Sequence, residues 1–231
     1  MAPQRLPSEP VRYIPSVPRK HFSTVLFDLD GTLIDSTELI LSSYRHTLET
    51  HRGVAPADDV WIAGLGTPLW VQFKKFTNDP AEIDAMVATY RDHNREHHDA
   101  MVQEFPGVLE AVGQLRDRGT RLGIVTSKKR HGAERGLTLC GFDGLFDVVV
   151  TADDVERHKP NPEPVVRALE RLGSRTTDTI FVGDSPHDID AGRGAGVATG
   201  AVLWGPFPRR TLEEHQPDHW IAEPADLSKL R

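Results

Sequence analysis

Residues 27–36 read "FDLDGTLIDS" and place two aspartates directly behind the apolar run at residues 25–27. Such a run is typical of a strand that is buried on both faces. A carboxylate in these surroundings is costly unless a cation or a hydrogen bond compensates its charge. Asp28 and Asp30 therefore indicate either a tight turn or a site with its own chemistry.

Four further apolar, β-rich runs follow along the chain, and all but the last lead into a helical pattern. They are "RLGIVTS" (121–127), "FDVVVTADD" (146–154), "TIFVGD" (179–184) and "ATGAVLWG" (198–205). Strands that alternate with helices favour parallel pairing through right-handed crossovers. The sequence therefore predicts an α/β fold whose core is a doubly wound, parallel, Rossmann-like sheet.

One long segment, residues 36–104, interrupts this alternation because it contains helical patterns and no convincing strand. We expect it to form a small, all-helical cap domain inserted after the first strand. The α/β core then comprises residues 21–35 and 105–231. The proline-rich residues 1–20 are expected to be a flexible leader, whose role the sequence leaves open.

Composition excludes several classes of function. The 231 residues are 38% hydrophobic and 26% charged, with a net charge of -7, which argues against the basic surface of a nucleic-acid-binding protein. The single cysteine, Cys140, excludes an intrachain disulfide, and we interpret it as a buried apolar residue near a helix end. We find no bilayer-spanning run and no signal peptide, so we expect a cytoplasmic protein without membrane contact, either a monomer or a homodimer.

Polar residues follow three of the expected strands in the sequence. They are Asp28, Asp30, Thr126, Ser127, Asp184 and Asp188. Lys159 lies in the loop "RHKPNPEP", between the third strand and the next helix. Because the carboxyl ends of parallel strands share one edge of a sheet, we expect all these side chains to converge there.

The converging residues suit phosphoryl transfer, in which catalysis is mostly positioning and charge stabilisation. Asp28 and Asp184 can supply the one or two carboxylates through which proteins usually hold Mg²⁺. Lys159 is a compact cation for the phosphate, and Thr126 and Ser127 offer donors to its oxygens.

Asp28 can also attack phosphorus itself, since carboxylates are nucleophiles that form an aspartyl-phosphate. Asp30, two residues further on, is placed to protonate the leaving oxygen and then to deprotonate the attacking water. Gly31 allows the backbone to turn sharply at this point.

These motifs resemble those of the haloacid dehalogenase-like (HAD) superfamily of phosphohydrolases, from about residue 21 to the end of the chain. The four motifs appear in the family's order as "FDLDGT", Thr126 in "GIVTSK", Lys159 in "HKPNPEP", and "GDSPHD" with Asp184 and Asp188. The resemblance implies that Asp28 is the nucleophile, that Asp30 is the acid/base and a backbone-carbonyl ligand of Mg²⁺, and that Asp184 is a further metal ligand. It implies that Asp188 orients the metal's waters.

Asp30 points to a phosphatase, because the dehalogenase branch of the family does not need a second acid/base aspartate. The helical cap is similar to that of phosphoglycolate phosphatase and of the related pyrophosphatase. We therefore expect hydrolysis of a small, phosphoglycolate-like phosphomonoester, with inorganic diphosphate as the alternative substrate. The cap loop "GLGTPL" is expected to select the substrate through Gly64, Leu65, Gly66 and Leu69.

Residues of this sequence also suit three other functions. A phospho-accepting regulatory module could also use Asp28, although it would have no use for Asp30 as an acid. Lys74 and Lys75 could form a Schiff base, but they are more typical of a solvated helix face. A third possibility is a metal site at His93, His97 and His98, which lack a partner set elsewhere in the sequence.

Overall fold

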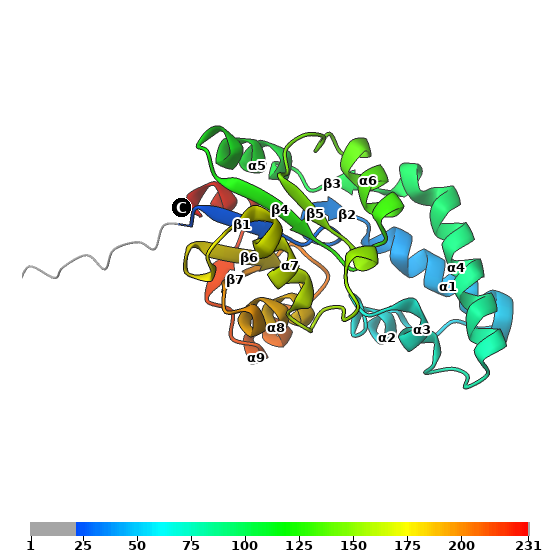
Figure 1. Cartoon of the computed structure of the whole chain (residues 1–231). Helices are drawn as coiled ribbons and strands as arrows, with labels where there is room; N and C mark the ends of the chain where they lie inside the picture. The colour runs from blue at the N-terminus through cyan, green and yellow to red at the C-terminus, as the bar shows by residue number, and fades with distance from the viewer. Residues whose placement is uncertain (1–21, 231) are drawn as a thin grey trace, which may run out of the picture.

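A parallel sheet forms the centre of the protein in a computed structural model that describes residues 22–230 (Figure 1). The leader expected at residues 1–20 lies outside the described residues. Within them the sheet has six strands in the order β5-β4-β1-β6-β7-β8, and every neighbouring pair is parallel. The strands are β1 (Thr24–Phe27), β4 (Arg121–Val125), β5 (Val148–Val150), β6 (Thr179–Gly183), β7 (Ala198–Val202) and β8 (His219–Ile221).

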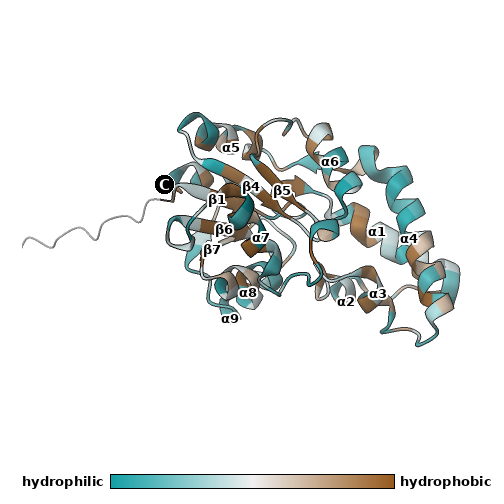
Figure 2. Cartoon of the chain, in the orientation of Figure 1, coloured by the Kyte–Doolittle hydropathy of each residue, from teal (hydrophilic) through white to brown (hydrophobic). Residues whose placement is uncertain are grey.

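Helices cover both faces of this sheet because its central strands are apolar on both sides, as the brown strands of Figure 2 show. Val25 and Phe27 of β1 pack into one buried cluster, and Leu26 packs into another on the opposite face. The first cluster includes residues of α5 (Val108–Asp117), α6 (Arg130–Leu139) and the 3-10 helix η3 (Pro224–Lys229). The second includes residues of α7 (Glu163–Leu172) and α8 (Pro186–Ala195).

Four helices lie to one side of the sheet in Figure 1, and we call them the cap helices. They are α1 (Thr37–Arg52), α2 (Asp58–Ile62), α3 (Leu69–Phe73) and α4 (Pro80–Met101). Their buried residues form a cluster of their own, in which Tyr44 stacks on Trp61 at 4.2 Å between ring centroids. A short antiparallel ribbon of β2 (Ile34–Asp35) and β3 (Gln103–Glu104) closes the segment at both ends.

The predicted α/β class is confirmed, and each of the five expected strands is present. Four short elements were not expected: β3, which falls inside the segment predicted to lack strands, α2, α9 (Arg209–Glu214) and β8. They are two to six residues long, which is too short for a hydrophobic period to identify. The division into domains at residues 35–36 and 104–105 stays a prediction.

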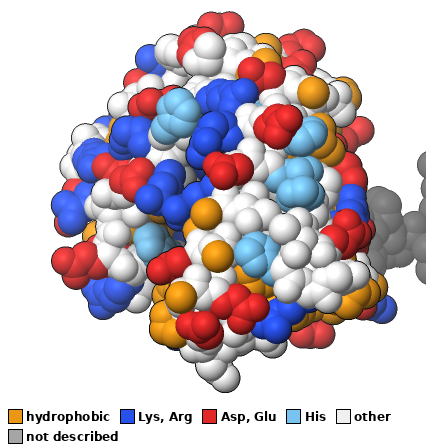
Figure 3. All heavy atoms as spheres, turned by 90° about the vertical axis from the view of Figure 1, so that its right-hand side faces the viewer, with side chains coloured by type: hydrophobic (Ala, Val, Ile, Leu, Met, Phe, Trp, Pro, Cys, Tyr) orange, Lys and Arg blue, Asp and Glu red, His pale blue; other side chains and the backbone are white. Residues whose placement is uncertain are grey.

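The surface over the cap helices carries mixed charges. Figure 3 shows Lys, Arg, Asp, Glu and His side chains interspersed there, with hydrophobic side chains in small separate patches. Among the helices of residues 22–230, none combines the length and apolar composition needed to cross a membrane.

Packing between β1, β4 and β5 depends on a glycine. A Cβ at Gly123 would lie 2.7 Å from side-chain atoms of both Leu26 and Val148. We therefore expect Gly123→Ala to lower the free energy of unfolding by about 1–3 kcal/mol through overpacking. Gly113→Ala in α5 is the matched control, since open space surrounds that position, and it should stabilise the protein by up to ~1 kcal/mol. Urea unfolding measures both, and equal stability of Gly123→Ala and the wild type would contradict the packing argument.

Candidate active site

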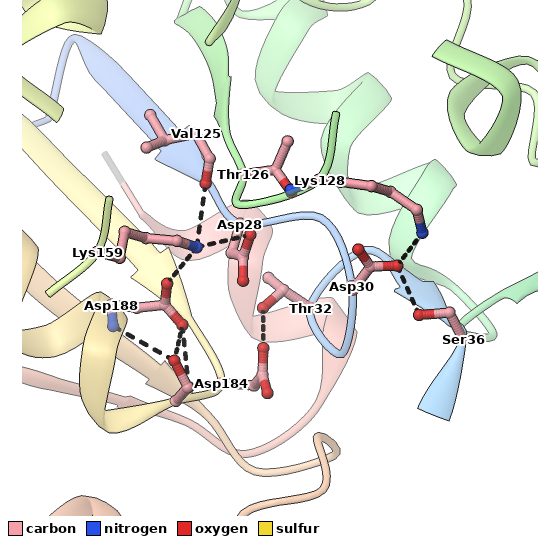
Figure 4. A network of polar contacts seen from close by, with 11 residues as sticks. Asp28, Asp30, Thr32, Ser36, Val125, Thr126, Lys128, Lys159, Asp184 and Asp188 are labelled. Carbon is pink, nitrogen blue, oxygen red and sulfur yellow. Dashed lines mark hydrogen bonds and ion pairs between the residues drawn. The ribbon is translucent and has the colours of Figure 1, made fainter. Parts of the chain in front are cut away.

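The carboxyl ends of β1, β4 and β6 meet at one edge of the sheet, where polar side chains form a connected network (Figure 4). Asp28 follows β1 directly, and its backbone N–H donates to the Val182 carbonyl of β6 at 2.9 Å. The Asp28 side chain is almost buried, with 11% of its surface exposed. Strand pairing therefore fixes this carboxylate at the edge where its neighbours converge.

Lys159 compensates the charge of Asp28. Its Nζ lies 2.8 Å from Asp28 Oδ1 and 2.7 Å from Asp188 Oδ1, and it donates to the Val125 carbonyl at 3.3 Å. These acceptors match the three N–H groups of an ammonium. With only 2% of its side chain exposed, Lys159 is held between the three segments.

Asp188 joins the network through both oxygens. Oδ1 accepts from Lys159, whereas Oδ2 accepts from the Ser185 backbone N–H at 3.0 Å and from the Ser185 hydroxyl at 2.6 Å. The Ser185 hydroxyl in turn accepts the Asp188 N–H, which completes a capping box at the start of α8. The Asp188 side chain thus caps the start of α8 and also accepts a hydrogen bond from Lys159.

Asp184 follows β6 and is also buried. The Thr32 hydroxyl donates to its Oδ1 at 2.9 Å, so the "DGT" turn after β1 holds the carboxylate of another strand. A Cβ at Gly31, where φ is +79°, would lie 2.6 Å from Asp184 Oδ2. Glycine is therefore required here both for the backbone conformation and for the approach of Asp184.

Asp30 lies in a separate part of the network. Its Oδ1 accepts from Lys128 Nζ at 2.6 Å and from the Ser36 hydroxyl at 2.6 Å. Figure 4 shows Lys128 and Lys159 on different sides of Asp28. The two aspartates of the first motif thus have different cationic partners.

Thr126 and Ser127 follow β4, as expected. The Thr126 N–H donates to the Val150 carbonyl at 3.0 Å, and its hydroxyl oxygen accepts the Lys128 backbone N–H at 3.2 Å. The Ser127 Oγ atom is buried and has no hydrogen-bond partner among the described residues. Its predicted role toward phosphate stays a prediction.

Burial controls the protonation of the carboxylates. It raises the pKa of Asp28 to about 7, with Lys159 opposing and Asp188 reinforcing the shift. Burial, Asp188 and Asp28 likewise raise the pKa of Asp184 well above its ordinary value. Burial also acts to raise the pKa of Asp30, but the ion pair with Lys128 outweighs it, and that pKa is lowered.

The acidic cluster has the chemistry of a magnesium site. Asp28, Asp184 and Asp188 each offer an oxygen, and these atoms lie within 4.8 Å of one another. Oxygen ligands of an octahedral Mg²⁺ ion are about 3–4 Å apart, so the spacing fits the ion. Three carboxylates against the one ammonium of Lys159 would also leave two negative charges for a divalent cation to neutralise.

The hydrogen bonds separate the three carboxylates by role. Both oxygens of Asp188 already accept hydrogen bonds, whereas the contacts within residues 22–230 occupy only Oδ1 of Asp28 and of Asp184. This pattern favours Asp28 and Asp184 as direct ligands, with Asp188 behind them. A contribution from the Asp30 carbonyl stays a prediction.

The cap loop touches the core beside this network. A Cβ at Gly66 would lie 3.3 Å from the His187 ring and 3.9 Å from Ser185 Oγ. Leu65 packs both into the cap cluster and against the core cluster around Ile189. The loop therefore lies against the first turn of α8.

The other two predicted cap residues lie within the cap. Gly64 accepts a hydrogen bond from Gln72, whose side chain occupies the space that a Cβ would need, and Leu69 packs on the cap cluster. Selection of substrate by Gly64, Leu65, Gly66 and Leu69 stays a prediction.

The remaining candidates lie elsewhere. Lys74 and Lys75 are exposed on the cap, with Lys74 over the Trp70 ring at 5.0 Å. His93 stacks between His46 and His97, at 4.6 and 4.2 Å between ring centroids.

Two further side chains from the sequence analysis are buried. His98 is paired with Asp99 through Nδ1 at 2.8 Å. Cys140 ends α6, and burial raises its pKa to about 11.

Sequence reasoning assigned no contact to Thr32, Ser36, Ser185 or Lys128, which all bind a predicted carboxylate. Thr32 and Ser185 stand inside the quoted motifs, so their positions were a usable signal. Lys128 and Ser36 also stand at the ends of the quoted stretches "GIVTSK" and "FDLDGTLIDS", but a lysine or serine in a loop is usually solvated, so residue type gave no reason to assign them a partner.

Comparison with known proteins agrees with this arrangement. A family model described as haloacid dehalogenase-like hydrolase matches residues 25–202, a span that contains the whole network. The chain belongs to this family. It is a HAD-like phosphatase, as the motifs predicted.

The relatives give the family match more detail. Pyrophosphatase PpaX of Halalkalibacterium halodurans is 45% identical over 205 residues, which cover 89% of this chain and 94% of that protein. Pyrophosphatase PpaX of a Bacillus cereus strain is 43% identical over the same shares of the two chains.

Solved structures share the fold. A HAD-like hydrolase from Bacteroides fragilis has a TM-score of 0.83 at 28% identity, covering 89% of this chain and 99% of that one. A proposed phosphoglycolate phosphatase from Lactobacillus plantarum has a TM-score of 0.82 at 28% identity, covering 91% of this chain and all of that one.

Gly31 offers a direct test of the acidic cluster. Gly31→Ala should displace Asp184 and weaken Mg²⁺ binding about tenfold or more, because a misplaced ligand loses the near-ideal octahedral geometry that Mg²⁺ demands. Gly53→Ala is the control, since Gly53 has a similar φ of +76° but nothing within 4 Å of its Cβ position. Calorimetric Mg²⁺ titration of both variants makes the comparison. Equal losses would show that backbone strain, rather than contact with Asp184, explains the effect.

Proposed function

We propose that this protein hydrolyses inorganic diphosphate with the help of Mg²⁺, through an aspartyl-phosphate on Asp28. The observation that carries the proposal is the pairing of two aspartates with separate environments. Asp28 lies in the acidic cluster beside Lys159, and Asp30, two residues on, is held by Lys128 and Ser36. One carboxylate is thus available to attack phosphorus and the other to move protons.

In the first step, an oxygen of the Asp28 carboxylate forms a bond to one phosphorus atom. The bond from that phosphorus to the bridging oxygen breaks, and the second phosphate leaves with a proton from Asp30. Lys159 and the donors of Thr126 and Ser127 stabilise the oxygens of the transferred phosphoryl group.

In the second step, water attacks the aspartyl-phosphate. Asp30 takes a proton from that water, the bond from phosphorus to Asp28 breaks, and the carboxylate is regenerated. The ion pair with Lys128 lowers the pKa of Asp30, which favours release of its proton in the first step and leaves the carboxylate ionised to accept one in the second.

Magnesium, held by Asp28 and Asp184 with Asp188 behind them, supplies charge neutralisation for the phosphoryl oxygens. The fit of the three carboxylates to an octahedral ion supports this cofactor.

We propose diphosphate rather than a phosphomonoester as the substrate because of the names that the relatives carry. Proteins 42–45% identical across most of this chain carry the name pyrophosphatase, whereas the neighbour called a phosphoglycolate phosphatase is 28% identical. The sequence motifs alone had put a phosphoglycolate-like monoester first, and that substrate is the second candidate. Cytoplasmic location and a monomeric or dimeric state stay predictions from the sequence.

The substrate proposal is tested by phosphate release from diphosphate and from phosphoglycolate, with Mg²⁺ and with a chelator in its place. We expect a higher kcat/KM for diphosphate, dependence on Mg²⁺, and no activity in Asp28→Asn, which lacks the nucleophilic carboxylate. Activity in the Asp28→Asn protein equal to wild type would refute the nucleophile. A higher kcat/KM for phosphoglycolate would refute diphosphate as the substrate and favour the second candidate, a phosphoglycolate-like monoester.

Replacing the second aspartate separates an enzyme from a phospho-accepting module. Asp30→Asn should slow steady-state phosphate release by about 10²–10⁴-fold, the usual contribution of general acid–base catalysis. If turnover were unaffected, Asp30 would not be the acid/base, and the regulatory alternative would gain support.

A further inference from the structure

Two lysines lie at the active-site edge, and they differ in what they can still bind. Lys159 has 2% of its side chain exposed and three acceptors for its three N–H groups. Lys128 has 16% exposed, and the contact given for its Nζ within residues 22–230 is Asp30 Oδ1 at 2.6 Å. Lys128 therefore has unoccupied N–H donors to offer a ligand. Each N–H of Lys159 already has an acceptor, so Lys159 acts on the transferred phosphoryl group through its charge.

The position of Lys128 relative to a substrate follows from Asp30, given the proposed function. A proton from Asp30 can reach the bridging oxygen only if that oxygen lies within hydrogen-bond distance of its carboxylate. The departing group is attached to the same oxygen. It must therefore lie on the Asp30 side of the reacting phosphorus, where Lys128 Nζ is in direct contact with that carboxylate.

The loop that carries Lys128 is fixed at its base. The Lys128 backbone N–H donates to the Thr126 hydroxyl at 3.2 Å, one residue from the unpartnered buried hydroxyl of Ser127. The same three-residue segment thus carries the ammonium that Asp30 holds and a buried hydroxyl that has no partner within residues 22–230.

We propose that Lys128 binds the departing phosphate of diphosphate and thereby favours substrates whose leaving group is negatively charged. This inference rests on the proposed function and adds the group that recognises the second phosphate. An ammonium bonded to phosphate oxygens is a charge-assisted contact, and the attraction grows as the departing phosphate gains charge. A leaving group that departs as a neutral alcohol gains no such attraction.

The experiment compares Lys128→Met with wild type on two substrates at saturating Mg²⁺, diphosphate and phenyl phosphate, whose leaving group carries no phosphate. We expect the ratio of kcat/KM for diphosphate to kcat/KM for phenyl phosphate to fall at least about tenfold, as for loss of one charged hydrogen bond. Lys128→Arg should recover most of the ratio. Lys129→Met, at the exposed neighbouring lysine, is the matched control and should leave the ratio unaltered.

A second measurement needs no turnover. Binding of methylenediphosphonate, a diphosphate that cannot be hydrolysed, should weaken at least about tenfold in Lys128→Met by calorimetry. An unchanged ratio with unchanged binding, or an equal fall on both substrates, would overturn the role of Lys128. Absence of diphosphate hydrolysis by the wild type would instead refute the proposed function, and methylenediphosphonate binding would then decide the role of Lys128 by itself.

Discussion

The buried ammonium of Lys159 joins segments that are far apart in the chain, because it binds Asp28 after β1, Asp188 in α8 and the Val125 carbonyl of β4. Neither charge would be tolerated alone in this position, since a buried lysine and a buried carboxylate both need a partner. Burial lowers the pKa of Lys159, but Asp188 and Asp28 outweigh it and raise that pKa, so the side chain stays charged. The parallel order of the strands is what brings these partners to one edge.

Sterics impose a second constraint on the same edge. Gly31, Gly183 and Gly205 each face an aspartate so closely that a Cβ would collide with it. Glycine at these positions allows the carboxylates to crowd together, although burial and, after it, repulsion from neighbouring aspartates raise the pKa values of Asp28 and Asp184. Crowding of this kind is costly without a bound cation and favourable with one, because a divalent ion offsets the excess charge. The glycines and the aspartates therefore point to the same ligand.

The sequence predicted this edge well because its residues follow directly from strand polarity. Asp28, Thr126 and Asp184 each stand behind an apolar run, and the ends of parallel strands must meet. Lys128 could not be found in this way, since the "SKKR" stretch looks like a solvated surface. The short α2 and β8 were missed for another reason: elements of five and three residues carry no usable period, and tertiary packing decides whether they form.

The contrast between core and cap explains why the four motifs predict the type of reaction more readily than the substrate. The groups proposed to act on the transferred phosphoryl belong to the strand ends, where topology fixes them. The groups proposed for the leaving side come from Lys128, in the loop after β4, and from a cap loop whose Leu65 packs in both the cap cluster and the cluster around Ile189. Gly66 lies against His187, next to the capping box that orients Asp188. If the cap loop selects the substrate as predicted, selectivity depends on how the cap packs on the core, and this contact can change while the four motifs stay the same.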